Sequence, residues 1–512
     1  MNATATKIPV MPVVHTIIGL LILFSGFFLP APSLVVQPTE KLMALNLPQV
    51  DGGLLLSVTH TGMIVTMIFF GVVYLWTFVD IIWPSFFGVA ALIFSGYAPA
   101  PKVLTMFVGN PTVAMVFILL MMSSAIIYSD VSGWLARYLL TRKFTHGRPW
   151  VLTATILFTT FICSFLGAIP TCLLMWPVIF RIFNATGFKK GDKYVSVLTV
   201  CICMMTLMAF ASDAFKGGAF YILSNLMNLA ANDPQLNAPI INLGAYLLFG
   251  VIVSVISIVL LLLLMRFILR IDVSRLAHLD PKILDGDSLP PMNSLQKLVI
   301  FDFFFYVAWM LLPSVIGTGN PVGAFLQRNS LAGSLVAVCL LTMVFFKGKR
   351  AINLSASNAK YPWAVYLMFA VAMLLGGAMT GPGTQVSQFM TAGLHRLFFG
   401  MNVFVLTVLV AVIGIVLTNF CNSVTLGIVL SPVLLSLAQA VGMPAAPLLV
   451  VFTYSVLIAA CTPAGSVYSA ALFGNTDWVD VSEMVRYTVI ASAVILLVII
   501  VVGIPLSNLL FA

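Results

Sequence analysis

Long apolar runs recur along the whole chain, and they constrain its fold more than any other feature. An α-helix needs about 20 consecutive apolar residues to cross the hydrocarbon core of a bilayer. Runs of that length lie near residues 10–30, 60–79, 81–97, 111–129, 193–230, 242–270, 297–313, 330–346, 361–379, 446–473 and 487–511. With 61% hydrophobic and 8% charged residues, the chain cannot surround one core with a polar shell. The sequence therefore predicts an all-α polytopic membrane protein.

Two further apolar stretches, about 150–184 and 401–441, are too long for one span and are interrupted at their middle. The first contains CSFLGAIPTCLLMWP (163–177) and the second contains TNFCNSVTLGIVLSP (418–432). Non-helical backbone survives at membrane depth only where it is buried in protein or lines a cavity. We therefore expect each stretch to form a re-entrant hairpin, in which two short helices meet at a polar tip, in addition to about eleven transmembrane helices.

Positive charge sets the expected orientation, because cytoplasmic loops carry an excess of Lys and Arg. The basic residues form four groups: Arg137, Arg142, Lys143 and Arg148; Lys189, Lys190 and Lys193; Arg270, Arg275 and Lys282; and Lys347, Lys349, Arg350 and Lys360. All four become cytoplasmic if residues 150–184 enter and leave on one side. The sequence thus predicts a multi-pass protein of the inner (plasma) membrane with a cytoplasmic N-terminus, in which the first apolar run is a retained span rather than a signal peptide. The net charge of +9 then gives no reason to expect a nucleic-acid partner.

The two halves of the chain repeat the same order of features. PVIFRIFNATG (177–187) and PVLLSLAQAVG (432–442) share Pro, Val, Ala and Gly at the same offsets, and each follows an interrupted stretch. Each also precedes a long apolar segment that is broken, by ASDAFKGG (211–218) in the first half and by CTPAGS (461–466) in the second. Because the halves would have opposite topology, the pattern is typical of an inverted-repeat transporter.

Three charged residues that lie inside the predicted spans, away from their ends, are candidates for a function. Asp213 and Lys216 flank the first break, and Asp302 is a lone acid in LVIFDFFFYVAW. An Asp or Lys at a helix centre costs about 2.5–3.5 kcal/mol on insertion scales, so such residues are functional candidates by default. Asp213 and Lys216 could take part in a functional site, and proton transfer by Asp213 is one form of that role. Alternatively, they form a structural ion pair, or their side chains extend to the membrane–water interface. We expect Asp302 to line an interface between domains or subunits.

Almost the whole chain resembles the divalent anion–sodium symporter family, within the wider ion-transporter superfamily. The supporting stretches are FVGNPTVAMVF (107–117), GRPWVLT (147–153), NSVT (422–425) and CTPAGS (461–466). The resemblance implies a homodimer in which each chain has a scaffold domain and a moving, elevator-type transport domain. It also implies transport of dicarboxylates, tricarboxylates or sulfate, by sodium symport or by exchange.

The resemblance also implies domain boundaries. Residues 1–148 and 297–400 would be scaffold helices. Residues 149–271 would form the first half of the transport domain, with its hairpin and broken helix, and residues 401–512 would form the second half. Residues 272–296 would be a cytoplasmic linker between the halves.

In that family each half has a Ser-Asn-Thr motif at its hairpin tip and a Thr-Pro break in the following helix. The second half of this chain keeps much of the pattern, whereas the first-half tip reads GAIPT (167–171) and has lost the Ser and the Asn. The candidate substrate-binding residues are Thr171, Asn422, Ser423, Thr425, Thr462 and Gly465. No cofactor is expected. Sodium could bind in the second half near Asn422 and Thr462, but the first tip has few oxygen ligands for it.

Lys216 suggests that the first half compensates the charge of a bound anion without sodium. Its ammonium would take the place of the missing cation and would neutralise a bound anion without a sodium gradient. Asp213 would pair with Lys216 when no anion is bound. Asp213, Lys216 and the neighbouring Ser212 are therefore the candidate coupling or charge-compensating residues. This hypothesis favours a mode of transport that does not depend on sodium.

The sequence therefore predicts a secondary transporter of small divalent organic anions such as C4-dicarboxylates, working by exchange or with weak sodium dependence. The alternatives are a sodium- or proton-coupled symporter of anions or sulfate, and a cation antiporter, which Lys216 disfavours. An intramembrane enzyme is a remote alternative, because the chain has neither HExxH nor two facing acids. The chain also has no nucleotide-binding motif for transport driven by ATP.

Overall fold

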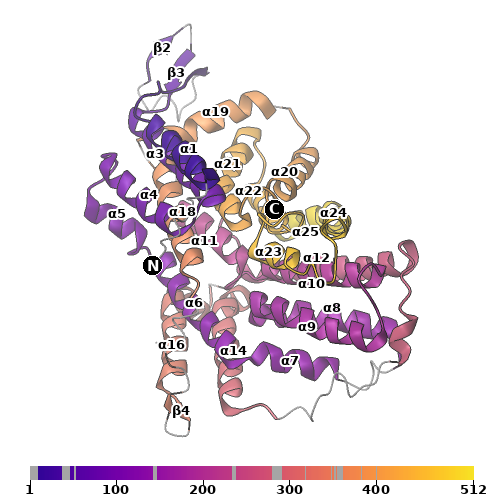
Figure 1. The fold of residues 1–512 in the computed structure, drawn as a ribbon. Helices are drawn as coiled ribbons and strands as arrows, with labels where there is room; N and C mark the ends of the chain where they lie inside the picture. The colour runs from indigo at the N-terminus through magenta and orange to yellow at the C-terminus, as the bar shows by residue number, and fades with distance from the viewer. Residues whose placement is uncertain are drawn as a thin grey trace, which may run out of the picture.

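The computed structural model of the chain describes residues 10–36, 47–50, 53–141, 147–232, 238–278, 291–317, 319–346, 349–350, 353, 361–381, 383–398 and 400–511. The helices of the first half are α1 (Val10–Ser25), α3 (His60–Phe78), α4 (Ile82–Phe94), α5 (Ala100–Phe107), α6 (Pro111–Ser129), α7 (Val131–Leu140), α8 (Pro149–Leu166), α9 (Ala168–Thr186), α10 (Lys193–Ser212), α11 (Gly218–Asn232) and α12 (Leu243–Leu263), which continues as the π-turn η3 (Leu264–Ile268). The short 3₁₀ helix η4 (Ser274–His278) follows (Figure 1).

The second half has a similar succession of helices. They are α14 (Ser294–Ile316), α15 (Pro321–Arg328), α16 (Ser330–Met343), α18 (Trp363–Thr380), α19 (Val386–Phe398), α20 (Val403–Leu417), α21 (Ser423–Val441), α22 (Ala445–Val456), α23 (Val467–Phe473), α24 (Val481–Val498), the π-turn η5 (Ile499–Gly503) and α25 (Ile504–Phe511). Within the described residues, nine helices are long and apolar enough to cross a membrane, or up to eleven if each bent helix pair counts as one span. The prediction of an all-α polytopic membrane protein is confirmed.

The first interrupted stretch folds as a helix hairpin. α8 ends at Leu166, Gly167 adopts an extended conformation with φ −171°, and α9 begins at the next residue. The two helices pack on each other and both pack on α10. They contain 18 and 19 residues, so each is about 27–28 Å long, close to the thickness of the hydrocarbon core. The expectation of two short helices is therefore wrong for this hairpin.

The second interrupted stretch has a more open arrangement. α20 ends at Leu417, and Asn422 caps the beginning of α21. Both helices pack on α22, and α21 also packs on α19 and α11. α19 has His395 and Arg396 in its last turn. The two hairpins therefore differ in shape although their sequences repeat.

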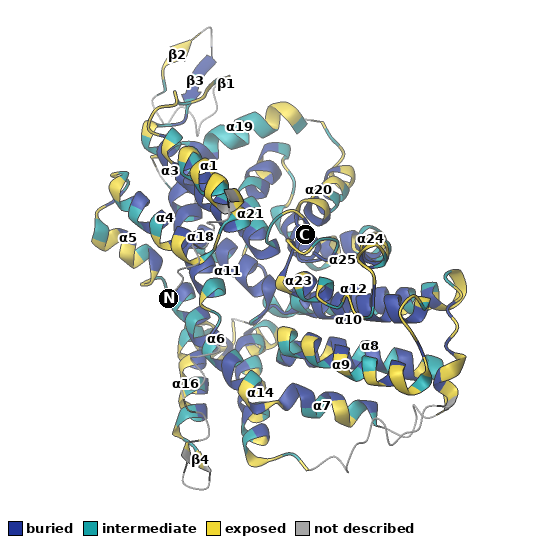
Figure 2. Ribbon diagram, in the orientation of Figure 1, coloured by how far each residue is buried: buried dark blue, intermediate teal, exposed yellow. Residues whose placement is uncertain are grey.

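Both broken helices lie deep in the molecule. The first is interrupted at residues 213–217, between α10 and α11, and the second at residues 457–466, between α22 and α23. In the most apolar part of α10, 94% of the residues are buried, whereas in that of α14 only 28% are (Figure 2). A Cβ atom on Gly218 would lie 2.4 Å from Cε1 of Phe210 and 2.9 Å from Cδ2 of Leu457. The two breaks therefore contact each other at a point that has room only for glycine.

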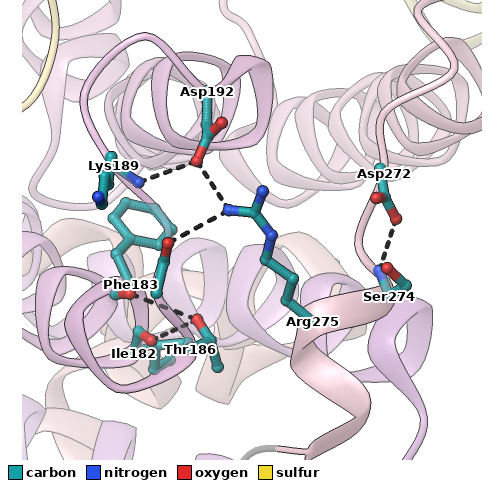
Figure 3. Close-up of polar contacts among 9 residues, drawn as sticks. Ile182, Phe183, Thr186, Lys189, Asp192, Asp272, Ser274 and Arg275 are labelled. Carbon is teal, nitrogen blue, oxygen red and sulfur yellow. Dashed lines mark hydrogen bonds and ion pairs between the residues drawn. The ribbon is translucent and has the colours of Figure 1, made fainter.

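The loop between α9 and α10 joins several parts of the chain. Arg275 donates to the Asp192 carboxylate at 3.1 Å and to the Gly187 carbonyl at 3.2 Å (Figure 3). Lys190 forms an ion pair with Asp480 at 2.9 Å, just before α24. The second and third basic groups thus lie close to each other.

Some of the basic residues lie outside the described residues: Arg142, Lys143, Lys282, Lys347 and Lys360. The same is true of residues 279–290 of the expected linker. The described start of that linker is folded onto the first half, because η4 contacts α8 and α9. The Ser274 backbone N–H donates to Asp272 at 2.9 Å, and this hydrogen bond lowers the pKa of the Asp272 carboxyl, which is exposed outside the spans.

A small sheet follows α1 and is not predicted from the sequence. Its strands are β1 (Ser33–Val36), β2 (Gln49–Val50) and β3 (Gly53–Ser57), in the antiparallel order β1-β3-β2. Ser33 pairs with Ser57, and Val36 pairs with Leu54. A two-stranded ladder, β4 (Phe345–Phe346) with β5 (Lys349–Arg350), follows α16. Neither sheet is large enough to change the fold class.

Candidate functional site

The first break is organised by the Asp213 carboxylate. Its Oδ1 atom accepts hydrogen bonds from the backbone N–H groups of Phe215, at 3.1 Å, and Lys216, at 3.0 Å. The Asp213 carbonyl also accepts from the N–H of Phe220 at 3.2 Å. Asp213 is 4% exposed, so these bonds satisfy polar groups that would otherwise be buried without partners. The residue types of ASDAFKGG therefore produce a tight turn between α10 and α11.

The ammonium of Lys216 reaches the tip of the first hairpin. Nζ donates to the carbonyl oxygen of Leu166 at 2.6 Å and lies 5.3 Å from the centroid of the Phe303 ring. Leu166 is the last residue of α8, where unpaired carbonyl groups carry the negative end of the helix dipole. A cation at this point is favoured by the dipole and by the aromatic face. Lys216 thus joins the break to the hairpin through a positive charge.

Asp213 and Lys216 do not pair with each other. No ion pair joins the two side chains in the part of the chain that the structure describes. This structure therefore shows no direct ion pair between them, and their pairing in the absence of substrate stays a prediction. The reason is local, because the Asp213 carboxylate is held by the turn whereas the lysine side chain extends toward α8.

Two tyrosines hold the backbone on either side of Asp213. The Tyr306 hydroxyl on α14 donates to the carbonyl of Phe215 at 3.0 Å, and the Tyr246 hydroxyl on α12 donates to that of Ala211 at 3.0 Å. Both side chains are fully buried. Sequence reasoning missed them, because nothing in the sequence distinguishes these two among thirteen tyrosines.

The tip of the first hairpin has a buried donor without a partner. Thr171 lies in the first turn of α9 and is 1% exposed, and its hydroxyl forms no hydrogen bond with any described residue. No side chain caps the N-terminus of α9. Hydroxyl and free backbone N–H groups near a helix N-terminus are suited to an anion. Thr171 therefore lies at the beginning of α9 with an unused hydroxyl, and its role as a substrate ligand stays a prediction.

The second tip is organised by Asn422. Its Oδ1 atom accepts from the N–H groups of Val424 and Thr425, both at 3.1 Å, so that Asn422 is the N-cap of α21. Its amide nitrogen donates to none of the described residues. The Ser423 N–H donates to the Gly465 carbonyl at 3.1 Å, which brings tip and break together.

The remaining second-half candidates are buried or half-buried around this tip. The Thr425 hydroxyl bonds to Sδ of Met368 at 2.8 Å and is therefore already engaged. Gly465 lies close to other backbone, since a Cβ atom there would be 3.0 Å from the carbonyl oxygen of Thr418. The Thr462 hydroxyl donates to the carbonyl of Asn419.

Asn419 is the principal residue that sequence reasoning missed at this tip. Its Oδ1 atom accepts from the N–H of Cys461 at 2.7 Å, and its amide nitrogen donates to the Ile415 carbonyl at 2.6 Å. One side chain thus holds the second break against the end of α20. The signal was present in TNFCNS, where Asn419 stands three residues before Asn422.

The two halves therefore make a corresponding contact with different chemistry. In each half, a side chain from the broken helix donates to a backbone carbonyl at the hairpin tip. A neutral hydroxyl, from Thr462, does so in the second half, and a cationic ammonium, from Lys216, does so in the first. The substitution of charge for a neutral group is the main asymmetry of the site.

Ser212 has a different environment from the one that the sequence suggests. Its hydroxyl donates to the Met208 carbonyl at 2.8 Å and lies 3.0 Å from the Ser254 hydroxyl, which in turn lies 2.7 Å from the Tyr454 hydroxyl. These buried groups connect α10, α12 and α22. Ser212 thus contributes to the contact between the halves, and its hydroxyl is already engaged.

Comparisons with known proteins agree with this architecture. The family model described as "Citrate transporter" (CitMHS) matches residues 64–457. The chain is 24% identical over 351 residues to an uncharacterized transporter of Haemophilus influenzae, covering 68% of this chain and 70% of that protein.

A solved structure is similar in fold. The structure of Neisseria gonorrhoeae MtrF, described as illuminating a class of antimetabolite efflux pumps, superposes with a TM-score of 0.59 at 14% identity. The match covers 98% of this chain and 95% of that one. Since the family model covers most of the chain, the resemblance that the motifs indicated is confirmed: this chain belongs to the citrate transporter family, within the ion-transporter superfamily, and is a multi-pass membrane transporter rather than an enzyme.

Proposed function

We propose that this protein exchanges small organic anions carrying two carboxylates, such as C4-dicarboxylates, across the membrane without using a sodium gradient. The observation that carries the proposal is the hydrogen bond from the Lys216 ammonium to the Leu166 carbonyl. Carbonyl oxygens at a hairpin tip are suitable ligands for a sodium ion, and here one of them is bound by a cation that belongs to the chain. A covalently attached cation can balance a bound anion, but it cannot couple transport to an ion gradient because it is never released.

The donors around the two tips support an anionic substrate. Lys216 offers a positive charge, the uncapped N-terminus of α9 offers backbone N–H groups, and the Asn422 amide offers a donor that no described residue uses. Thr171 adds a buried hydroxyl that has no partner among the described residues. Positive and neutral donors together lower the cost of removing a carboxylate from water.

Exchange follows from the fixed charge. When no anion is bound, the Lys216 ammonium lacks that counter-charge in a buried setting, and moving it in this state costs more than moving it with substrate bound. The return step is therefore favoured when a second anion binds. In a sodium symporter the cation leaves with the substrate, so the empty protein does not retain the charge.

A tricarboxylate is the second candidate substrate. The description of the matched family as a citrate transporter favours it. Both classes make similar demands on helix ends, amides and hydroxyls. Sodium- or proton-coupled symport of an anion or of sulfate remains the alternative mode, with sodium as cargo near Asn422 and Thr462.

The proposal includes a homodimer of the inner membrane with scaffold and elevator-type transport domains. Two links between the halves support one moving body. They are the buried contact of Ser254 with Tyr454 and the ion pair of Lys190 with Asp480. α8–α12 and α20–α25 would move together, with residues 1–148 and 297–400 as the scaffold. Because η4 is folded against α8 and α9, residues 272–278 would move with the first half.

Uptake of labelled succinate into proteoliposomes tests the proposal. In sodium-free buffer, uptake should require unlabelled succinate inside, and an inward sodium gradient should not increase it. Lys216→Ala should lose uptake at least tenfold, whereas Lys216→Arg should keep a measurable part because it retains the charge. Unlabelled citrate, added outside as competitor, compares the two substrate classes.

Two outcomes would contradict the proposal. Uptake that appears only with a sodium gradient would show that a cation site works in this protein. Full activity of Lys216→Ala would show that the ammonium is not needed. Both variants should elute as a single species from a size-exclusion column before transport is compared.

A further inference from the structure

An open groove runs along the outer side of α8, and it ends at Ile162, four residues before the last residue of the helix. It has a volume of about 430 Å³ and lies between α8 and Leu139 of α7. Trp150, Ala154, Phe158 and Ile162 line it, and their spacing of four residues forms one continuous ridge of the helix. Ile162 is 49% exposed. The groove is therefore an apolar surface on a predicted membrane-facing helix.

One of the polar side chains in the groove is already engaged. The Thr155 hydroxyl donates to the Val151 carbonyl at 2.8 Å, so that it offers no free donor to a ligand. From Trp150 to Ile162 the groove extends about 18 Å along the helix. This length is close to half of the roughly 30 Å hydrocarbon core, which is the depth of one leaflet. An extended acyl chain fits both the length and the chemistry.

The end of the groove near Trp150 is positively charged. The Arg266 guanidinium lies 5.8 Å from the centroid of the Trp150 ring, and Arg148 precedes the first residue of α8. Both arginines are exposed. Within the described residues neither has an acidic partner, whereas Arg137 and Arg275 each form an ion pair with an aspartate. The rim therefore has two unneutralised guanidinium groups beside an aromatic ring.

The position of this rim matches a lipid headgroup. Tryptophan side chains are enriched at the membrane–water interface, and the positive-inside rule places this end of α8 on the cytoplasmic side. The cytoplasmic leaflet contains anionic lipids, and basic pockets between helices on that side bind their headgroups. Guanidinium groups bind phosphate oxygens through paired hydrogen bonds.

From this combination we propose that the α7–α8 groove binds an anionic phospholipid. One acyl chain lies along the ridge from Trp150 to Ile162, and Arg266 and Arg148 bind the phosphate. A neutral phospholipid offers the same chain without the net negative charge, so the arginines give the site its selectivity. Since α8 ends at the carbonyl that Lys216 binds, the lipid contacts the helix that carries the first hairpin tip.

Thermal unfolding of the purified, delipidated protein in a neutral detergent tests the site. Added phosphatidylglycerol should raise the Tm more than the same amount of phosphatidylcholine, because binding to the folded state stabilises it. The double variant Arg148→Gln/Arg266→Gln should weaken the apparent affinity for phosphatidylglycerol roughly tenfold or more. The matched control is Arg328→Gln/Arg396→Gln, which removes two exposed charges from α15 and α19 and should respond like the native protein.

A second variant examines the apolar part without changing charge. Ala154→Phe fills the middle of the groove and should also reduce the Tm rise caused by phosphatidylglycerol. Equal stabilisation by the two lipids, or an unchanged response in the Arg148/Arg266 variant, would overturn headgroup recognition. An unchanged response in Ala154→Phe would show that the chain does not lie in this groove.

Discussion

At the scale of single residues, the intramembrane charges behave in different ways. The Asp213 carboxylate accepts a hydrogen bond from the Lys216 backbone N–H in its own turn, and the Lys216 ammonium donates to the last carbonyl of α8. Asp302 has neither arrangement, since it is 1% exposed and its Oδ1 atom has no hydrogen-bond partner within the described residues. The general expectation that charged residues inside a membrane are functional does not distinguish these three residues. Their hydrogen bonds do distinguish them.

Replacing Asp302 with leucine should stabilise the protein. A buried carboxyl oxygen without a partner costs about 1–3 kcal/mol, and an apolar side chain of similar shape removes that cost. We expect a higher Tm in detergent and unchanged succinate exchange. Asp213→Leu is the control and should lower the Tm, because it removes the acceptor of two backbone N–H groups. A folded Asp302→Leu protein without transport would instead give Asp302 a role in the transport cycle.

At the scale of elements, the broken helices depend on close backbone packing. Gly218 begins α11 directly after the break, where the Phe210 ring and the Leu457 side chain leave no room for a Cβ atom. The sequence pattern indicated glycines near the break, but one of the two side chains that crowd this position, Leu457, comes from the other half of the chain. The steric demand therefore could not be seen in ASDAFKGG alone.

Gly218→Ala should destabilise the protein by about 1–3 kcal/mol, because the added methyl group overpacks the contact between the two breaks. Gly377→Ala in α18 is the matched control, since no atom lies within 4 Å of its Cβ position. Alanine is the better helix former, so the control should be neutral or slightly stabilising. The Tm values of the two variants in detergent measure the difference. If Gly218→Ala were as stable as the native protein, the close contact between the breaks would not exist in solution.

At the scale of the whole molecule, polar contacts between the two halves differ in how far they are buried. The chain of hydroxyls from Ser212 through Ser254 to Tyr454 is buried, and it crosses from the first half to the second. In the loop between α9 and α10, Lys190 forms an exposed ion pair with Asp480 of the second half. An ion pair of this class stabilises a protein by about 0–1 kcal/mol. The buried link should therefore contribute more to the association of the halves.

A double-mutant cycle measures that link. Tyr454→Phe and Ser254→Ala should each lower the free energy of unfolding, and their combined effect should be smaller than the sum by about 0.5–1.5 kcal/mol, the net value of one hydrogen bond. The same cycle on Lys190→Ala and Asp480→Ala should give a smaller coupling energy. Additive effects of Tyr454→Phe and Ser254→Ala would mean that the two hydroxyls do not interact.

Much of the architecture was determined by the sequence alone. Apolar runs of spanning length identify helices such as α6 and α24, because a chain in a membrane must satisfy its backbone hydrogen bonds within each segment. The interruptions at GAIPT and TNFCNS locate the two tips for the same reason. The roles of Thr171 and Asn422 remain predictions, although both residues lie at helix beginnings as the motifs indicated.

Only the tertiary structure decided which groups meet. It places the Lys216 ammonium on the Leu166 carbonyl rather than on Asp213, three residues away, and it brings Asn419 to Cys461. It also selects Tyr246, Tyr306 and Tyr454 among the tyrosines. These contacts join segments that lie far apart in the chain, and local spacing does not determine the direction of a side chain at a break in a helix. Hydrophobic periodicity specifies helices, whereas the pairing of buried polar groups depends on how those helices pack.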